Sequence, residues 1–462
     1  LRAPCTYGVL PANGLLYVPP HNCACYVRSK LSGFMAMSSS RDTGARKGNP
    51  GLIQAKRGAS EDKAVPGVFP ARLAAHDDTT ATDDWPTYRH DRGRSGRTMC
   101  AVGTELLLGW QTPLAAPLTS PVIADNRLYV ASMDAHRLHA LDAVTGEILW
   151  QYSFDARVDS PPTVHKGLVL CGCRDGSVHA LRAEDGALAW RFRAAPEERL
   201  IVSHGQLESV WPVNGSVLVL DDTAYFTAGR SSYLDGGIRF YGIDAQTGRK
   251  VVDTVLESRH PDGSEITDEQ GSVGMLSGIL SSDGARIFLR HQAIDRNGTP
   301  QPAVVPHLHG ADGYLSADTT TRLLWTYAPM YTSPHQGAFY DRRLSRTLFP
   351  SGRILVEGEE AIYGYGENHY AAPNPDPGGT WALFCAPKQS DVPLDLSARE
   401  YLDKARKGEL AIDFNWWTPL RIKVWAMVKT RDTLFVAGPP GGAITPQAAL
   451  DGDTPGELLA VS

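Results

Sequence analysis

Short apolar runs separated by turn-forming residues follow one another along most of the chain. The clearest set contains four runs: Ser120–Ala124, Leu128–Ser132, Leu138–Asp142 and Ile148–Tyr152. The connections between them carry the pairs Asp125-Asn126, Asp134-Ala135 and Thr145-Gly146. These residue types tolerate the tight or left-handed backbone that a short hairpin needs. The pattern therefore predicts a unit of four antiparallel strands.

This unit is repeated. The segment Leu138–Trp150 returns forty positions later as Val178–Trp190, and Ser120-Pro121 aligns with Ser160-Pro161 at the same offset. A four-stranded unit cannot bury both of its faces alone, so it must stack on neighbours, and blades around a central axis are the usual solution. The repeat therefore predicts an all-β fold, a β-propeller of seven or eight blades that is truncated at the chain ends.

More divergent copies follow the first two. They cover Val217–Gly248, Leu276–Trp325, Leu348–Leu383 and Lys423–Val461, the last without an outer strand. This makes about six units from residue 115 onward. We expect Trp110, within the strand-like run Leu106–Gln111, to supply the missing outer strand of the final blade and so close the ring.

The remaining segments define the predicted domain boundaries. Residues 1–38 resemble a blade remnant that belongs to this ring or to an upstream propeller. Residues 39–83 are polar and predict a flexible linker, and residues 84–462 predict the propeller itself. Ser397-Ala398-Arg399-Glu400 resembles a helix cap, which predicts a helical insertion at 395–410.

Composition and charge exclude two classes of protein. The chain of 462 residues has a formal net charge of −6, so it offers no generally basic surface for a nucleic acid. Its apolar runs are far shorter than the roughly 20 residues of a membrane-spanning helix. The 45 glycines and 32 prolines favour many short strands over helices.

The seven cysteines are spaced unlike those of a zinc ribbon or a covalent haem site. We interpret Cys171 and Cys173, which share one face of a strand, as small buried thiols. A metal site at His21, Cys23 and Cys25, and a disulfide from Cys5 to Cys23 or Cys25, are the alternatives near the start of the chain. No metal site is predicted overall.

The pattern Ala-Leu-Asp-Ala-x-Thr-Gly-x-x-x-Trp at 140–150 resembles the pyrroloquinoline-quinone-type (PQQ-like) β-propeller repeat. Quinoprotein dehydrogenases share this repeat with the lipoprotein of the bacterial outer-membrane assembly machinery. The block from Asp84 to Gly96 resembles the segment before the first blade in large bacterial envelope proteins with this repeat. The resemblance implies a location in the periplasm or at the cell surface, and it specifies the fold better than the activity.

In a four-stranded meander, the connection between strands two and three lies at the same end as the connection to the next blade. We call this end the mouth, and loops on a rigid scaffold are where ligands bind. Seven candidate cofactor-binding residues lie there: Arg157, Asp159, Arg174, Glu208, Trp211, Arg230 and Asp235. The arginines could bind carboxylates, Glu208 or Asp159 could hold a divalent cation, and Trp211 could stack on a planar ring. The alternative is a network of arginine–aspartate pairs that locks neighbouring blades together.

These observations favour a non-catalytic scaffold that binds a protein or a small-molecule ligand at the mouth. The alternative is a PQQ-dependent quinoprotein oxidoreductase of alcohols or sugars, with PQQ and calcium as cofactors. Members of that class usually carry two adjacent cysteines and a calcium set, and this chain has no adjacent cysteines. A hydrolase that uses Asp159, Glu208 and Asp235 is a third hypothesis.

Overall fold

The structure is a computed structural model. Its described residues are 84–115, 117–203, 205–258, 275, 277–290, 292–301, 305–310, 325–329, 349–367, 381–388, 412–440 and 456–461, with short pieces at 10–12, 15–18, 35–38, 65–66 and between 400 and 409. Everything below concerns these residues.

The two closest sequence copies form adjacent four-stranded antiparallel sheets. The first contains β5 (Val122–Ala124), β6 (Arg127–Ser132), β7 (Arg137–Asp142) and β8 (Ile148–Ser153). The second contains β9 (Thr163–His165), β10 (Leu168–Cys173), β11 (Ser177–Arg182) and β12 (Leu188–Arg193), with β4 (Val65–Pro66) added at its edge. The strand order follows the chain order in both, as the repeat predicted.

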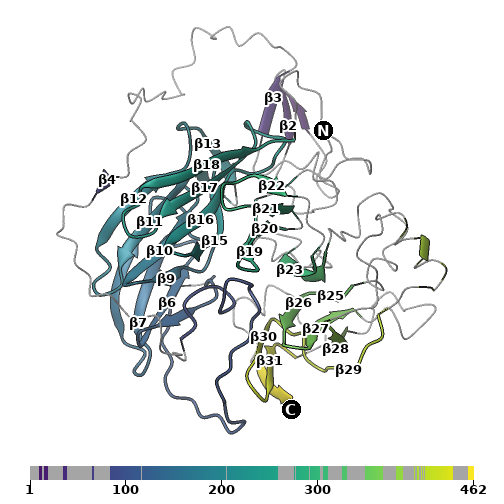
Figure 1. The fold of residues 1–462 in the computed structure, drawn as a ribbon. Helices are drawn as coiled ribbons and strands as arrows, with labels where there is room; N and C mark the ends of the chain where they lie inside the picture. Colours follow the sequence, from purple (N-terminus) through teal and green to yellow (C-terminus); the bar gives the residue numbers. More distant parts are fainter. Residues whose placement is uncertain are drawn as a thin grey trace, which may run out of the picture.

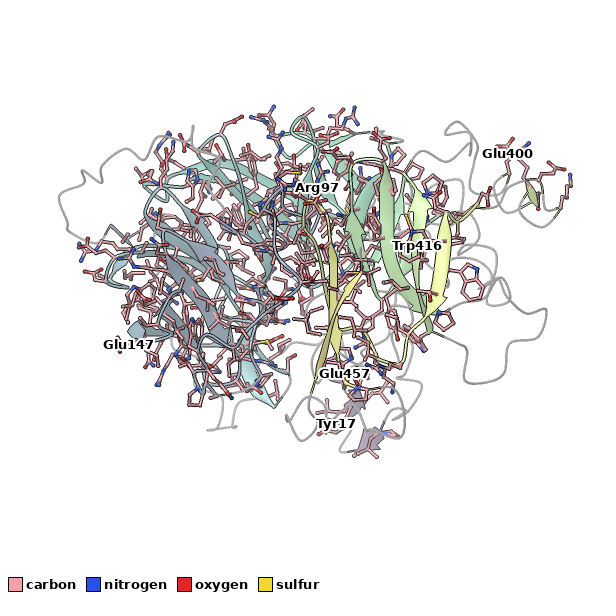
Figure 2. All side chains as sticks on the ribbon, turned by 90° about the horizontal axis from the view of Figure 1, so that it is seen from below. Tyr17, Arg97, Glu147, Glu400, Trp416 and Glu457 are labelled. Carbon is pink, nitrogen blue, oxygen red and sulfur yellow. The ribbon has the colours of Figure 1, made fainter. Side chains whose placement is uncertain are left out.

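Five further sheets follow the same meander. Their strands are β15 (Val213–Leu220), β16 (Thr223–Ala228), β17 (Ile238–Asp244) and β18 (Lys250–Leu256); β19 (Leu280–Ser282), β20 (Ile287–Leu289), β21 (Gln292–Ile294) and β22 (Pro300–Gln301); β23 (His307–Gly310), β24 (Trp325–Ala328) and β25 (Ser351–Gly352); β26 (Ile354–Glu357), β27 (Ala361–Glu367), β28 (Trp381–Pro387) and β29 (Trp416–Pro419); and β30 (Ala426–Lys429), β31 (Leu434–Gly438) and β32 (Glu457–Val461). Figure 1 shows these sheets arranged in sequence order around a common centre, and Figure 2 shows Trp416 on the outer strand of its sheet.

The ring confirms the predicted all-β propeller. Neighbouring sheets touch through their first strands: β9 contacts β5 and β15, β15 contacts β19, and β26 contacts β30. Buried apolar clusters fill the space between adjacent blades, as between the sheets that contain Leu170 and Phe226. No helix in the described part of the chain has the length and apolar character needed to cross a membrane.

One predicted unit is wrong. The sequence prediction treated Leu276–Trp325 as a single blade, whereas β19 to β22 already complete a sheet by Gln301 and Trp325 lies in the next one. The described residues therefore form seven sheets from Val122 onward, one more than the sequence predicted. The strands β20 and β21 are three residues each with a two-residue connection, too short to stand out as separate apolar runs.

Two smaller sheets lie outside the seven. The strands β1 (Leu10–Ala12), β2 (Leu15–Val18) and β3 (Met35–Ser38) form a three-stranded sheet, and β13 (Leu200–Ser203) pairs with β14 (Gln206–Ser209) as a hairpin. Most of the predicted linker at 39–83 and of the predicted helix at 395–410 lies outside the described residues, as do Cys5, His21, Cys23 and Cys25. The domain boundaries themselves stay predictions.

A tryptophan on each of the first two outer strands packs against the next blade, and we call this contact the tryptophan clasp. The contact has the same form each time: the indole Nε1 donates to an alanine carbonyl, and the ring lies against a glycine with positive φ. The pairs are Trp150 with Ala183 (3.0 Å) and Gly186 (φ 73°), and Trp190 with Ala245 (3.1 Å) and Gly248 (φ 69°). A Cβ at Gly186 would lie 2.5 Å from the Trp150 ring. The repeat motif thus encodes contacts between blades, in addition to turns.

Trp110 makes the same clasp onto the first blade, but not from a strand. Its Nε1 donates to the Ala143 carbonyl at 3.1 Å, and a Cβ at Gly146 would lie 2.4 Å from its ring. The prediction that Leu106–Gln111 is the outer strand of the final blade is wrong, because residues 101–115 carry no strand and β32 has no fourth partner among the described strands. Trp110 therefore packs against the first blade as the repeat tryptophans pack against theirs, although it does not lie in a strand.

The segment 84–98, here called the axial segment, runs through the centre of the ring. It contacts all seven sheets, and its partners are Ile123, Val164, Ser216, Ser282, Trp325, Glu357 and Lys429. Arg94 is fully buried and donates to the Leu280 carbonyl at 3.0 Å. Figure 2 shows Arg97 beside the strands of the last sheet, where it forms a parallel bridge with Lys429. The axial segment therefore fills the space that the first strands enclose.

Candidate functional site

The seven predicted mouth residues lie in loops and in the β13–β14 hairpin, and they gather into two ion-pair groups. Arg174, Asp159 and Glu208 form one group. Arg230, Asp235 and Trp211 form the other. Arg157 instead pairs with Asp134 at 3.0 Å between Nη2 and Oδ1. The Arg157 carbonyl also accepts from the Arg174 N–H at 2.9 Å, so the structure brings all seven into direct contact with another predicted residue.

The Arg174 group is a buried cation between two carboxylates. Its Nη2 lies 2.6 Å from Asp159 Oδ2 and its Nη1 lies 3.1 Å from Glu208 Oε1. Both acidic side chains are only 2% exposed. Burial raises the pKa of Glu208, and the Arg174 charge only partly opposes it. The guanidinium has two counterions already, so it has little capacity left for an added anion.

The second group is centred on Asp235, which contacts two arginines and a tryptophan. Arg230 and Arg199 both pair with Asp235, and the indole Nε1 of Trp211 donates to the Asp235 carbonyl at 3.1 Å. Trp211 is 4% exposed, and the Arg199 guanidinium lies 4.8 Å from its ring centroid. The ring face is therefore already occupied by a cation, which leaves no open surface on which a planar cofactor could stack.

These residues do not fit a quinone with calcium. Calcium requires six to eight oxygen ligands, whereas Asp159, Glu208 and Asp235 each face an arginine at close range. The contacts of these residues instead match the alternative that the sequence left open, a network of arginine–aspartate pairs. No step of quinone chemistry can be derived from the described residues of the mouth.

The β13–β14 hairpin lies across the mouth and was not anticipated from the sequence. Gln206 Oε1 lies 2.5 Å from His136 Nε2, and the Ser209 N–H donates to the Arg174 carbonyl at 2.8 Å, so the hairpin is fixed to the first two blades. Glu208 projects from its inner face into the Arg174 group. The sequence signal was present in the apolar run Leu200, Ile201 and Val202, but this run is too short to distinguish a strand from a loop.

The outer face of this hairpin is apolar and exposed. Leu200, Val202 and Leu207 are 52%, 47% and 61% exposed. Val202 and Leu207 are directly paired in the ladder, and Leu200 lies two residues from Val202, so all three share one face. An exposed apolar face with polar groups around it is typical of a protein interaction site.

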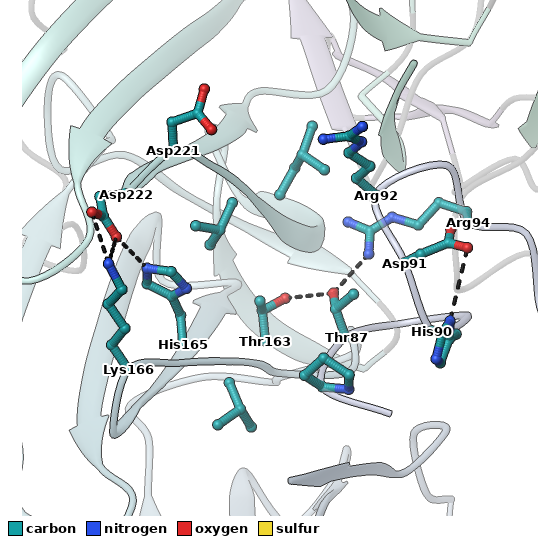
Figure 3. Close-up of a pocket in the computed structure, with 14 residues that line it drawn as sticks. Thr87, His90, Asp91, Arg92, Arg94, Thr163, His165, Lys166, Asp221 and Asp222 are labelled. Atoms are coloured by element: carbon teal, nitrogen blue, oxygen red, sulfur yellow. Dashed lines mark hydrogen bonds and ion pairs between the residues drawn. The ribbon is translucent and has the colours of Figure 1, made fainter. Parts of the chain in front are cut away.

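A cavity of about 560 Å³ lies at the opposite end of the strands, beside the axial segment (Figure 3). Thr87 and Arg94 line one side, and the turns after β9 and β15 line the other. Asp222 there accepts from Lys166 Nζ at 2.9 Å and lies 2.7 Å from His165 Nε2, and these contacts lower its pKa. No predicted site residue lies in this cavity, and its charges are also largely paired.

Comparisons with known proteins match the part of the chain that contains the repeat. Residues 87–296 match a family model described as outer membrane protein assembly factor BamB. A protein of that name from Xanthomonas campestris is 33% identical over 87 residues, which is 17% of this chain and 21% of the relative. The quinohemoprotein alcohol dehydrogenase ADH IIB of Pseudomonas putida is 33% identical over 121 residues, 22% of this chain and 17% of the relative.

The matched segments therefore span about a fifth of these curated relatives. Among solved structures, a quinohemoprotein alcohol dehydrogenase from Comamonas testosteroni is similar to 78% of this chain and to 71% of its own, with 13% sequence identity and a TM-score of 0.49.

Proposed function

Since the chain carries PQQ-like propeller repeats and belongs to the quinoprotein alcohol dehydrogenase-like superfamily, we propose that it is a non-catalytic propeller that binds a partner protein in the bacterial cell envelope. The proposal commits to a site, the apolar outer face of the β13–β14 hairpin. A small-molecule ligand at the mouth is the lesser possibility, because the charged groups there are already paired.

The exposed hairpin is the observation that carries this function. Its two strands pair only with each other among the described strands, so the edge of β13 has no strand partner there, whereas β14 is attached to the second blade through the Ser209 N–H. A partner strand can pair with such an edge, and its alternate side chains then contact the apolar face. The buried ion pairs beneath hold the hairpin in place, which lowers the entropy lost on binding.

The relatives indicate the class of partner and the compartment. The family model and the Xanthomonas relative are both described as outer membrane protein assembly factors. We therefore place this chain in the periplasm or at the cell surface, with a component of an outer-membrane protein assembly machinery as its partner.

Site-specific photo-crosslinking in the native host tests this proposal. A photoreactive residue replaces Leu207 on the hairpin or, as the control, Val251 on β18, which is 55% exposed and lies on an outer strand. We expect the probe at 207, and not the one at 251, to crosslink to an assembly-machinery component identified by mass spectrometry. A Leu207→Asp variant should lose about tenfold or more in affinity for that component. Equal crosslinking from both positions, or none from 207, would contradict the proposal.

The alternative is a quinoprotein oxidoreductase of alcohols or sugars. One observation favours it, the 33% identity over 121 residues to a quinohemoprotein alcohol dehydrogenase. The glycines and tryptophans of the repeat motif pack blades against one another in this chain. The alternative therefore needs a cofactor site other than the paired charges of the mouth.

A further inference from the structure

Three side chains of metal-ligating types meet in the second blade, at its mouth end and next to Arg174 in the sequence. They are Cys173 at the end of β10, Asp175 in the following turn and His179 on β11, and one ligand atom from each lies within 4.8 Å of the others. Cys173 is 0% exposed and His179 is 2% exposed. The sequence prediction interpreted Cys173 only as a small buried thiol.

His179 is unusual because neither of its ring nitrogens has a hydrogen-bond partner among the described residues. The nearest charged atom is Asp175 Oδ2, at 3.5 Å from Nε2. A buried polar group without a partner costs free energy and needs an explanation. A bound cation would satisfy the unpaired nitrogen.

The first blade provides an internal comparison, because His139 occupies the equivalent position forty residues earlier. His139 Nε2 lies 3.0 Å from Ser132 Oγ, and its Nδ1 lies 3.2 Å from Gln151 Nε2. In the second blade these partners are replaced by Gly172, which has no side chain, and by Arg191, which pairs with Asp175. The hydrogen-bond partners that His139 has in the first copy are thus missing in the second.

The same comparison shows that the other two ligands belong to the second copy. Cys173 stands where the first blade has Met133, and Asp175 stands where it has Ala135. The second copy has therefore lost two hydrogen-bond partners of its histidine and has a thiol and a carboxylate beside it instead. Packing alone requires neither of these side chains, because the first blade packs without them.

Neighbouring groups hold Asp175 and His179 in place. The Ser177 N–H donates to Asp175 at 2.8 Å and Arg191 Nη2 lies 2.5 Å from its Oδ2, so the carboxylate is oriented. Phe154 contacts the His179 ring edge-on at 5.1 Å. Arg191 is 39% exposed, which places the route from solvent on the side of Asp175.

We propose that Cys173, Asp175 and His179 bind one zinc ion, with the fourth position open to water. The combination of sulfur, nitrogen and carboxylate oxygen matches the zinc preference, at about 2.3 Å for sulfur and about 2.0 Å for nitrogen and oxygen. On binding, the Cys173 S–H bond breaks, the proton passes to solvent and a Zn–S bond forms, with no change of oxidation state. The thiolate and carboxylate together neutralise the divalent charge, and the charge of Arg191 is balanced by Asp155, 3.1 Å from its Nη1.

Cobalt substitution of the full, reduced chain tests this site. A cysteine ligand gives Co²⁺ a thiolate charge-transfer band in the near ultraviolet, so we expect the band to saturate at one equivalent and zinc to abolish it. Cys173→Ala and Asp175→Ala should remove the band or weaken cobalt binding by about tenfold or more. Cys171→Ala, on the same strand and equally buried, is the matched control and should leave the band unchanged.

Thermal unfolding supplies a readout that does not depend on colour. Zinc should raise the melting temperature of the wild type and of Cys171→Ala but not of Asp175→Ala, whose near-ultraviolet circular dichroism without metal should match the wild type. Absence of a cobalt band in the wild type, or a band that survives Cys173→Ala, would overturn the proposal. Asp175 lies in a turn and is partly exposed, so we expect Asp175→Ala to fold. Its cobalt and zinc responses therefore test the site even where Cys173→Ala fails to fold.

Discussion

At the scale of single residues, the contact of Trp150 with Gly186 explains why the repeat motif ends in tryptophan and carries glycine in its turn. The glycine adopts a positive φ and leaves room for an indole from the preceding blade. Any side chain there is excluded by both backbone conformation and space.

We expect Gly186→Ala to destabilise the protein by about 2 to 4 kcal/mol, from backbone strain plus the clash with Trp150. Gly205→Ala is the matched control, because Gly205 has the same φ of 73° but no atom within 4 Å of an added Cβ. It should cost only the backbone term, about 1 kcal/mol. Denaturant unfolding of both variants measures the difference, and equal losses would show that the tryptophan clasp contributes nothing.

Arg174 is expected to be the most costly of the mouth arginines to remove. Arg174→Met leaves Asp159 and Glu208 as uncompensated buried charges and should destabilise the chain by about 3 to 5 kcal/mol. Arg182→Ala breaks the half-exposed pair with Asp185 and should change stability by less than about 1 kcal/mol. Chemical denaturation at neutral pH checks both, and a tolerated Arg174→Met would mean that the cluster does not anchor the mouth.

His307 introduces a pH dependence. Burial lowers its pKa below the ordinary value of 6.5, although the Val305 and Arg290 carbonyls beside its ring nitrogens oppose this. As the pH falls through 6.5, the unfolded chain therefore takes up the proton first. The stability contribution is fully present above that pH and is lost below it.

Wild-type protein should accordingly be less stable at about pH 5.5 than at about pH 7.5, and His307→Gln should show a smaller difference between the two. Urea unfolding at both pH values measures this. His139, whose pKa is also lowered by burial, remains in the variant, so some pH dependence should persist. An unchanged difference in His307→Gln would rule out this histidine as its source.

The sequence could predict that the charged residues gather at one end of the strands, but not which charges pair. Arg174 meets Asp159 from the preceding connection and Glu208 from the hairpin, so the pairing depends on side-chain directions in three dimensions. The same limit applies to Trp211, whose ring was open in the sequence prediction and is covered by Arg199 in the structure.

At the scale of elements, the axial segment is the feature that joins the blades. It has no strand of its own, yet its backbone and side chains contact all seven sheets of the ring. Arg94 is its centre: it is fully buried and bonds the Leu280 carbonyl, the Tyr88 carbonyl and Thr87 Oγ1 at 3.0, 3.1 and 2.7 Å.

We expect Arg94→Ala to lower stability by about 3 kcal/mol or more, because it leaves several buried acceptors without a donor. Arg92→Ala, two residues away on the exposed side of the same segment, should change stability by less than about 0.5 kcal/mol. Thermal unfolding of the pair provides the measurement. Similar melting temperatures for the two variants would contradict the role given to the axial segment.

Strand positions were predictable where the repeat is strong. In the first copy, all four strands lie within two residues of the predicted runs. The prediction failed at Leu276–Trp325, where three-residue strands give too little periodic signal, and at Leu106–Gln111, where an apolar run with a motif tryptophan does not form a strand. In both cases the outcome depends on contacts distant in the sequence.

At the scale of the whole molecule, the ring has two ends of different character. One end holds paired charges beneath an apolar hairpin, and the other holds the cavity beside the axial segment. Because the axial segment fills the centre between them, a planar cofactor at that level of the axis would have to displace chain that contacts all seven sheets. This arrangement favours binding through an outer surface.

Titration of the full chain with pyrroloquinoline quinone and calcium, followed by the quinone absorption spectrum and by dye-linked oxidation of alcohols and sugars, tests the central claim most directly. The account predicts no saturable spectral shift and no substrate-dependent dye reduction. A stoichiometric shift together with turnover would contradict it, because it would require a quinone site that the paired charges of the mouth do not supply.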